Sequence, residues 1–336
     1  MRSVQPLPRS CSLRSLALKA GALLLALAAL SGCVEAYNGP VVAPSEPMFL
    51  GDARPRAVGP LKRVAESDVR IVRKDVPTGT TAVLTSSFDM DTTVRAGTAF
   101  RTLEKRFTDH KGRAARVQSL GETLEGWFRF RIDYLKDKTI SVPEEPKDAK
   151  PSPVAGNSYL IELGIEDARI VADGGRIPDE DELAILREDG GLLRSLIAKT
   201  NEADSLVNTE LVTQSVRRAF TREAMEVEHL KVSFMGVRSV AGVPCAIFDI
   251  RVTSVIRKSE PDASLVVRLT LAGEYARRMD DGWEAELYLT GTAITTGTVF
   301  VEGNAVQINA AGHARFHIAA TYRLPDLPSL GAVAGL

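Results

Sequence analysis

The feature that most constrains the fold of this chain is an alternation of apolar and polar residues along several segments. Between residues 128 and 134, Phe128, Phe130, Ile132 and Tyr134 alternate with Arg129, Arg131 and Asp133. Because successive side chains of a strand point to opposite faces of a sheet, this pattern predicts a strand with one buried and one solvated face.

A second pair of alternating segments predicts a long antiparallel hairpin. Residues 265–272 and 283–290 alternate in the same way, and Asp280, Asp281 and Gly282 between them are turn-forming residues. Short spacings between turn residues indicate more antiparallel strands. We expect them at Val69–Arg73, Ala82–Phe88, Ala115–Leu120, Tyr159–Gly164, Ala168–Ala172, Leu230–Met235, Ala246–Ile256, Thr298–Glu302 and Gly312–Tyr322.

One zone in the middle of the chain has helical spacing instead. The acidic run Pro178–Glu182 is typical of a helix start, because acidic side chains complement the helix dipole there. We expect Gly190 and Gly191 to break the helical run. Helical spacing recurs after them in two sets of residues: Leu192, Leu193, Leu196 and Ile197, and then Val212, Val216, Ala219 and Phe220. Strands, then helices, then strands predict a β-rich α+β fold, with antiparallel sheets, long hairpins and a helical segment around 179–225. Whether the flanking strands form two similar halves stays open.

Composition and motifs narrow the function classes. The 336 residues are 44% hydrophobic and 25% charged with a formal net charge of −1, so the chain has no basic excess that would indicate nucleic acid binding. It contains no Gly-x-Ser-x-Gly, Ser-x-x-Lys, phosphate-loop or dinucleotide-binding pattern. We therefore expect a non-catalytic protein without a cofactor.

Several groups of polar residues deserve separate interpretation. Cys245 opens an apolar strand and is interpreted as a small buried side chain rather than a nucleophile. His313, Arg315 and His317 share one face of a strand, but the arginine between the histidines argues against a metal site, so a polar outer face is expected.

The remaining polar groups are expected to lie at the surface. Asp89 and Asp91 do not have the spacing of a calcium loop and are interpreted as solvated charges. Asp173–Arg176 is interpreted as a tight turn, and His110 is placed in a turn-like Asp109–Gly112. His229 follows a charged run and is also placed at the surface.

The N-terminal segment has the order of a targeting sequence. A basic region ends at Lys19, and the apolar stretch from Ala20 to Leu30 is too short to span a bilayer as a helix. It ends in Leu30-Ser31-Gly32-Cys33, which resembles the lipobox of bacterial lipoproteins. The alternative is an ordinary secretory signal that ends by chance on a cysteine.

The resemblance implies that residues 1–32, including Cys11, are removed as a signal peptide and that the Cys33 thiol carries a diacylglyceryl group. Several acyl chains would anchor the chain to a membrane. Val34 rather than Asp after the cysteine favours the outer over the inner membrane. In addition, the run from Val237 to Phe248 is similar in cadence to uncharacterised envelope lipoproteins of Gram-negative bacteria.

The chain after the cysteine divides into three parts. Residues 33–62 are rich in proline and glycine and are interpreted as a flexible tether; the alternative is an arm packed on the domain and anchored by Met48, Phe49 and Leu50. Residues 63–325 form the β-rich domain, and 326–336 a C-terminal tail.

Three functions are compatible with this organisation. The first is a membrane-anchored binding or interaction module of the cell envelope, with an envelope protein as partner. The second is a carrier or sensor of an apolar ligand in a cavity enclosed by the sheet. The third is a structural or assembly accessory of an outer-membrane machine.

Overall fold

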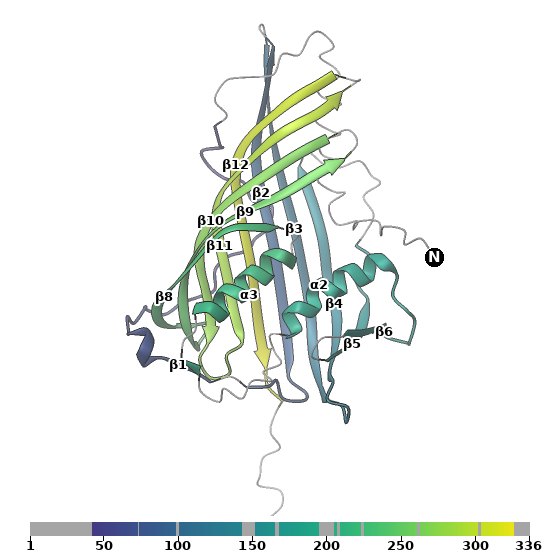
Figure 1. Ribbon diagram of the computed structural model, residues 1–336, viewed down its shortest axis with the longest axis vertical. Helices are drawn as coiled ribbons and strands as arrows, with labels where there is room; N and C mark the ends of the chain where they lie inside the picture. Colours follow the sequence, from purple (N-terminus) through teal and green to yellow (C-terminus); the bar gives the residue numbers. More distant parts are fainter. Residues whose placement is uncertain are drawn as a thin grey trace, which may run out of the picture.

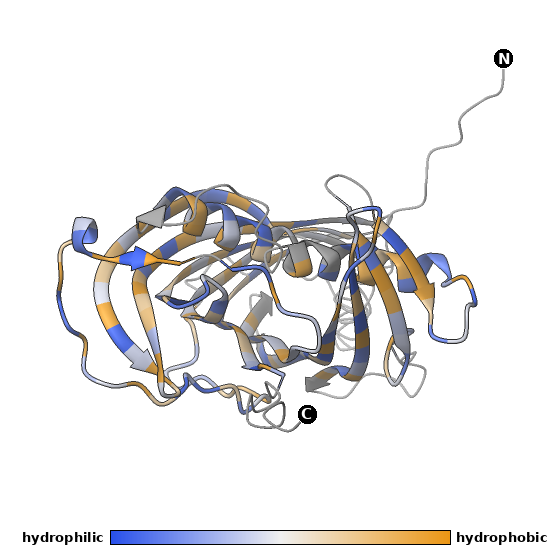
Figure 2. Cartoon of the chain, turned by 90° about the horizontal axis from the view of Figure 1, so that it is seen from below, coloured by the Kyte–Doolittle hydropathy of each residue, from blue (hydrophilic) through white to orange (hydrophobic). Residues whose placement is uncertain are grey.

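The domain is built on one curved antiparallel sheet (Figures 1 and 2). The computed structural model describes residues 42–72, 74–98, 101–142, 152–164, 168–194, 205–206, 209–222, 225–260, 263–301 and 304–325. The sheet strands are β2 (Thr81–Thr98), β3 (Arg101–Glu122), β4 (Phe128–Val142), β5 (Ser158–Leu163), β6 (Ala168–Ala172), β8 (Glu226–Val240), β9 (Val243–Glu260), β10 (Ala263–Arg278), β11 (Glu284–Val301) and β12 (Asn304–Arg323).

The strand order is that of two meanders joined side by side. From edge to edge the sheet runs β6-β5-β4-β3-β2-β12-β11-β10-β9-β8, and each neighbouring pair is antiparallel. The first and last long strands, β2 and β12, therefore meet in the centre. A separate two-stranded sheet pairs β1 (Arg70–Ile71) with β7 (Ser205–Leu206), and a short 3-10 helix η2 (Glu66–Asp68) precedes it.

The predicted alternation is confirmed. In β4, Phe128, Phe130, Ile132 and Tyr134 are buried, and in β10 so are Leu265, Val267, Leu269 and Leu271. The β10–β11 hairpin pairs Ala272 with Thr290 and turns at 279–283 as expected. Most strands are longer than predicted, because sheet pairing extends through polar stretches that carry no periodic signal. Asp109–Gly112, for example, lies inside β3 and is not a turn.

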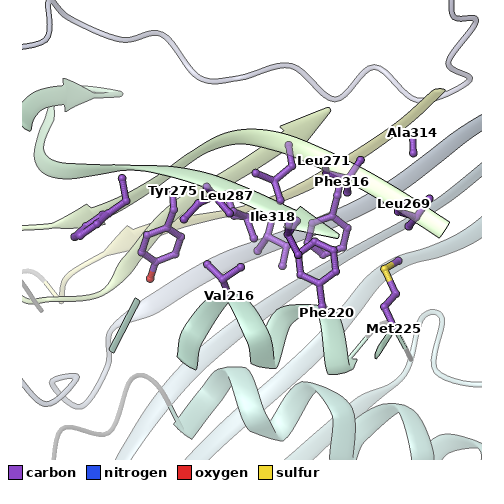
Figure 3. Packing of buried hydrophobic residues seen from close by; sticks show 14 of the residues in the cluster. Val216, Phe220, Met225, Leu269, Leu271, Tyr275, Leu287, Ala314, Phe316 and Ile318 are labelled. Atoms are coloured by element: carbon purple, nitrogen blue, oxygen red, sulfur yellow. The ribbon is translucent and has the colours of Figure 1, made fainter. Parts of the chain in front are cut away.

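Two helices, α2 (Glu180–Arg194) and α3 (Thr209–Arg222), cover one face of the sheet, which we call the inner face (Figure 1). Val212, Val216 and Phe220 of α3 are fully buried against it, as their spacing predicts. Figure 3 shows Phe220 reaching Phe316 of β12, with ring centroids 4.9 Å apart. Burying each such side chain stabilises the fold by about 1.5–3 kcal/mol.

The expected break at Gly190 and Gly191 is wrong, since α2 continues through both residues to Arg194. Leu186 and Leu193, on either side of the two glycines, are buried against β3, β4 and β5. This burial outweighs the helix cost of glycine, roughly 1 kcal/mol per residue.

The predicted start of α2 is confirmed in detail. Asp179 Oδ1 accepts a hydrogen bond from the Glu182 N–H at 2.9 Å, and Glu182 Oε2 accepts one from the Asp179 N–H at 2.9 Å. This reciprocal capping box satisfies two N–H groups at the helix terminus. Glu182 also bonds the Tyr159 hydroxyl and the Arg176 guanidinium. Mainly through the Arg176 hydrogen bond, the pKa of Glu182 falls to about 2.

Residues 42–62 form an arm across the other side of the sheet, which we call the outer face. The Lys62 N–H donates to the Val237 carbonyl at 2.8 Å and the Gly59 N–H to the Ser239 carbonyl at 2.9 Å, so the arm also pairs with edge strand β8. Of the two interpretations of this segment, the structure supports the packed arm over residues 42–62. Residues 33–41 of the predicted tether lie outside the described residues, as do Cys33 and 326–336.

Candidate binding sites

The first candidate site is the seam between the helices and the inner face. Two small cavities lie there and share Leu84 of β2 and Ile318 of β12 as lining residues. One is bounded by α2 through Asp189 and Leu193, and the other by α3 through Val216 and Ala219. The space open to water-sized molecules is ≈ 20 Å³ in the first and ≈ 10 Å³ in the second, room for about one water.

A buried polar cluster lies at one end of the first cavity. Arg113 of β3 donates from Nη1 to both carboxylate oxygens of Asp189 at 3.2 Å, and the Tyr134 hydroxyl donates to Asp189 Oδ2 at 2.6 Å. Arg113 Nη2 also lies 3.5 Å from Asp137. The cluster ties α2 to β3 and β4, so the seam combines apolar walls with one charged end.

The second candidate site is a set of six side chains on the outer face. Figure 1 places β3, β2 and β12 side by side, and the sheet register sets Asp89 of β2 opposite both His110 of β3 and Arg315 of β12. Asp91 lies opposite His313 and Thr108 in the same way. We call this set the outer-face track; its members are Arg106, Asp91, His313, Asp89, Arg315 and Glu286.

The two aspartates of the track are fully buried and ionised. Asp89 accepts hydrogen bonds from Arg315 Nε at 3.0 Å and Nη2 at 2.9 Å, and its Oδ1 lies 2.8 Å from His110 Nδ1. Burial acts to raise the pKa of Asp89, but the hydrogen bonds with His110 and Arg315 outweigh it and lower the pKa. The pKa of Asp91 is lowered against the same burial, chiefly by Arg106.

Side chains of the outer-face track hold the arm through contacts with the main chain of the arm. His313 Nε2 lies 2.7 Å from the Pro44 carbonyl oxygen, Arg106 donates to the Glu46 carbonyl at 2.7 Å, and the Met48 N–H donates to Asp91 at 2.7 Å. Further along, the Gly51 N–H donates to Asp89 at 3.0 Å, the Gly51 carbonyl accepts from Arg315 at 2.6 Å, and the Arg56 N–H donates to Glu286 at 3.0 Å.

Two expectations for these residues are wrong, and a third holds only in part. Asp89 and Asp91 are not solvated charges, because the arm and cross-strand partners cover them. His110 is not in a turn, and its side chain is only 16% exposed. The outer face around His313, Arg315 and His317 is polar as expected but lies beneath the arm, and His317 Nε2 lies 2.8 Å from Glu286 Oε1. Sequence spacing could not predict that these residues lie close together, since they come from strands far apart in the chain.

Three further interpretations, those of Cys245, Asp173–Arg176 and His229, agree with the structure. Cys245 is buried at the start of β9, and burial raises the pKa of its thiol to about 11. Asp173–Arg176 forms a turn in which Gly174 and Gly175 have φ of 93° and 83°. His229 lies exposed on β8. Within the described part of the chain, no three histidine, cysteine or acidic side chains are grouped to hold a metal ion.

Comparison with known proteins gives no family for this chain. No family model and no curated protein matches it. Among solved structures it is similar to an outer membrane lipoprotein-sorting protein domain from Vibrio parahaemolyticus, with 12% identity over 73% of this chain and 87% of that chain and a TM-score of 0.17. A TM-score this low does not establish a shared fold. Among the described helices, none has the length and apolar character needed to cross a membrane.

Proposed function

We propose that this protein is a non-catalytic binding module of the bacterial cell envelope, anchored by acyl chains on Cys33, that takes the apolar part of an amphipathic ligand into the seam. The lipobox-like Leu30-Ser31-Gly32-Cys33 supports the anchor. The observation that supports ligand binding is the pair of cavities beneath the two helices, which share Leu84 and Ile318 as lining residues.

The seam has the chemistry of such a site. Ligand pockets are mostly apolar with a few placed polar groups, and here Ala115, Val117 and Ile132 form the wall while Arg113 and Asp189 form the polar end. Because the present space admits only about one water, binding of a larger ligand would require α2 and α3 to shift away from the sheet. The same geometry suits a carrier or a sensor, and both begin with binding.

The ligand part of the proposal is tested with cis-parinaric acid, a fluorescent fatty acid, and the full-length protein purified from membranes and stripped of bound lipid. Leu84→Trp fills the point that both cavities share and should weaken binding at least tenfold. Val83→Trp is the matched control, since Val83 directly precedes Leu84 in β2 and its side chain is 39% exposed. Absence of binding to the wild type, or equal binding by Leu84→Trp, would reject the ligand site.

The anchor is tested separately by growing cells with radiolabelled palmitate. The wild-type protein should incorporate label and the Cys33→Ala variant should not. Equal labelling of the two proteins would show that Cys33 is not the acylation site. This result is independent of the parinaric acid experiment.

A further inference from the structure

The outer-face track binds its own arm in a manner that does not depend on most arm side chains. The contacts at Pro44, Glu46, Met48, Gly51 and Arg56 described above all reach main-chain atoms. The side chain of Met48 is left 46% exposed, and Ser45, Glu46 and Pro47 are exposed as well. What the track recognises is therefore a backbone that bends at residues 45–46 and 50–51 and presents its donors and acceptors in a fixed order.

Two features add selectivity to this backbone recognition. A Cβ atom at position 51 would lie 2.5 Å from the His110 ring and 2.7 Å from Asp89 Oδ1, so a glycine is required there. The His110 ring is held in place by Asp89, so it cannot swing away without loss of that contact. Two residues earlier, the Phe49 ring lies 4.6 Å from the Arg315 guanidinium, a cation–π contact.

The track does not need the arm in order to exist. Asp89 is paired with Arg315 and His110, Asp91 with Arg106 and Thr108, and Glu286 with His317, all between strands of the sheet. These cross-strand pairs fix the side chains in place and leave oxygens and N–H groups directed at the arm. A site that is organised before its ligand arrives loses little entropy on binding.

We propose that the outer-face track is a peptide-binding site, which the arm occupies in cis and which also binds a segment of another polypeptide when the arm leaves. The ligand is a chain that follows the bent path of residues 44–51, with a glycine where Gly51 lies and an aromatic residue two positions before it. Its main chain donates to Asp91 and Asp89 and accepts from His313, Arg106 and Arg315. This site lies on the opposite side of the sheet from the seam and does not rest on the proposed function.

The experiment uses the full chain with a protease recognition sequence inserted between the exposed Arg54 and Pro55. Cleavage separates residues 42–54 of the arm from the rest of the domain, so that this part can exchange. A fluorescent peptide with the sequence of residues 42–54 is then added, and its anisotropy is measured against protein concentration. The cleaved protein should bind the peptide saturably, and the uncleaved protein at least tenfold more weakly, because its own arm occupies the track.

Matched peptides test the recognition itself. The Gly51→Val peptide should bind at least tenfold more weakly than wild type, whereas a Ser45→Ala peptide should bind within twofold. These peptide variants leave the protein intact, so misfolding cannot explain their effect. The proposal is overturned if the wild-type peptide does not bind the cleaved protein, if the uncleaved protein binds it equally well, or if the Gly51→Val peptide binds as tightly as the wild type.

Discussion

The two faces of the central strands are covered in opposite ways. On the inner face, α3 packs through apolar side chains, and Figure 3 shows Val216 and Phe220 of α3 directed at apolar residues of the sheet such as Phe316 and Ile318. On the outer face, the arm packs chiefly through hydrogen bonds between its backbone and charged side chains of the sheet: its N–H groups donate to aspartates and its carbonyls accept from arginines. Apolar contacts stabilise without fixing direction, whereas hydrogen bonds require one register. The inner face thus supplies most of the stability, and the outer face specifies one path for the arm.

The largest expected effect is on the inner face. Phe220→Ala removes a fully buried ring that contacts Phe316, and it should lower the free energy of unfolding by about 3–5 kcal/mol. Urea denaturation followed by circular dichroism measures the loss. Arg217→Ala on the exposed side of α3 is the control and should stay within about 0.5 kcal/mol of the wild type. A loss below about 1 kcal/mol in Phe220→Ala would contradict the assigned role of α3.

The corresponding change on the outer face should cost less overall but leave a different signature. Arg315→Met leaves the buried Asp89 without its main cationic partner and should lower the free energy of unfolding by about 3 kcal/mol. Adding Asp89→Leu removes the uncompensated charge, so the double variant should unfold at a higher urea concentration than Arg315→Met alone. A double variant that is less stable than the single one would mean that hydrogen bonds, not charge, dominate this face.

Acidic pH should weaken the packing on the outer face more than the packing on the inner face. The pKa values of Asp89 and Asp91 are lowered in the folded protein, so their contribution is complete above the unfolded pKa of about 3.9 and is lost as pH falls through the folded values. Hydrogen exchange of the Met48 and Gly51 amides, corrected for intrinsic rates, should therefore accelerate below about pH 4. Amides of α3 should change less over the same interval. Equal protection of Met48 and Gly51 at pH 3 and pH 5 would show that the carboxylates do not hold the arm.

The smallest expected effect is on the labelling rate of Cys245, which reports how tightly the arm is held. Cys245 is buried in an apolar cluster that includes Leu61 of the arm. Gly51→Val should loosen the arm and raise the rate of maleimide labelling of Cys245 at pH 8 a few-fold, measured by peptide mass spectrometry. Ser45→Ala should leave the rate unchanged. If Gly51→Val has no effect, the two ends of the arm are held independently.

The inner face could be predicted from the sequence much better than the outer face. Phe128–Tyr134 and Leu265–Leu271 alternate with a period of two, and Val212, Val216 and Phe220 recur at helical spacing, so local geometry alone indicates which side is buried. The capping box at Asp179 and Glu182 is equally local. The break predicted at Gly190 and Gly191 does not occur, because the helix cost of glycine, about 1 kcal/mol per residue, is smaller than the free energy gained by burying Leu186 and Leu193.

The sequence by itself determined the β-rich character, the antiparallel hairpins, the position of the helical zone and the lipobox-like Leu30–Cys33. Only the tertiary structure decided that Asp89, His110 and Arg315 meet and that residues 42–62 cover them. Periodicity is a property of neighbouring residues, and each segment carries it alone. The pairing of β2 with β12 joins residues more than 200 positions apart, and no local pattern encodes which strand becomes the neighbour of which.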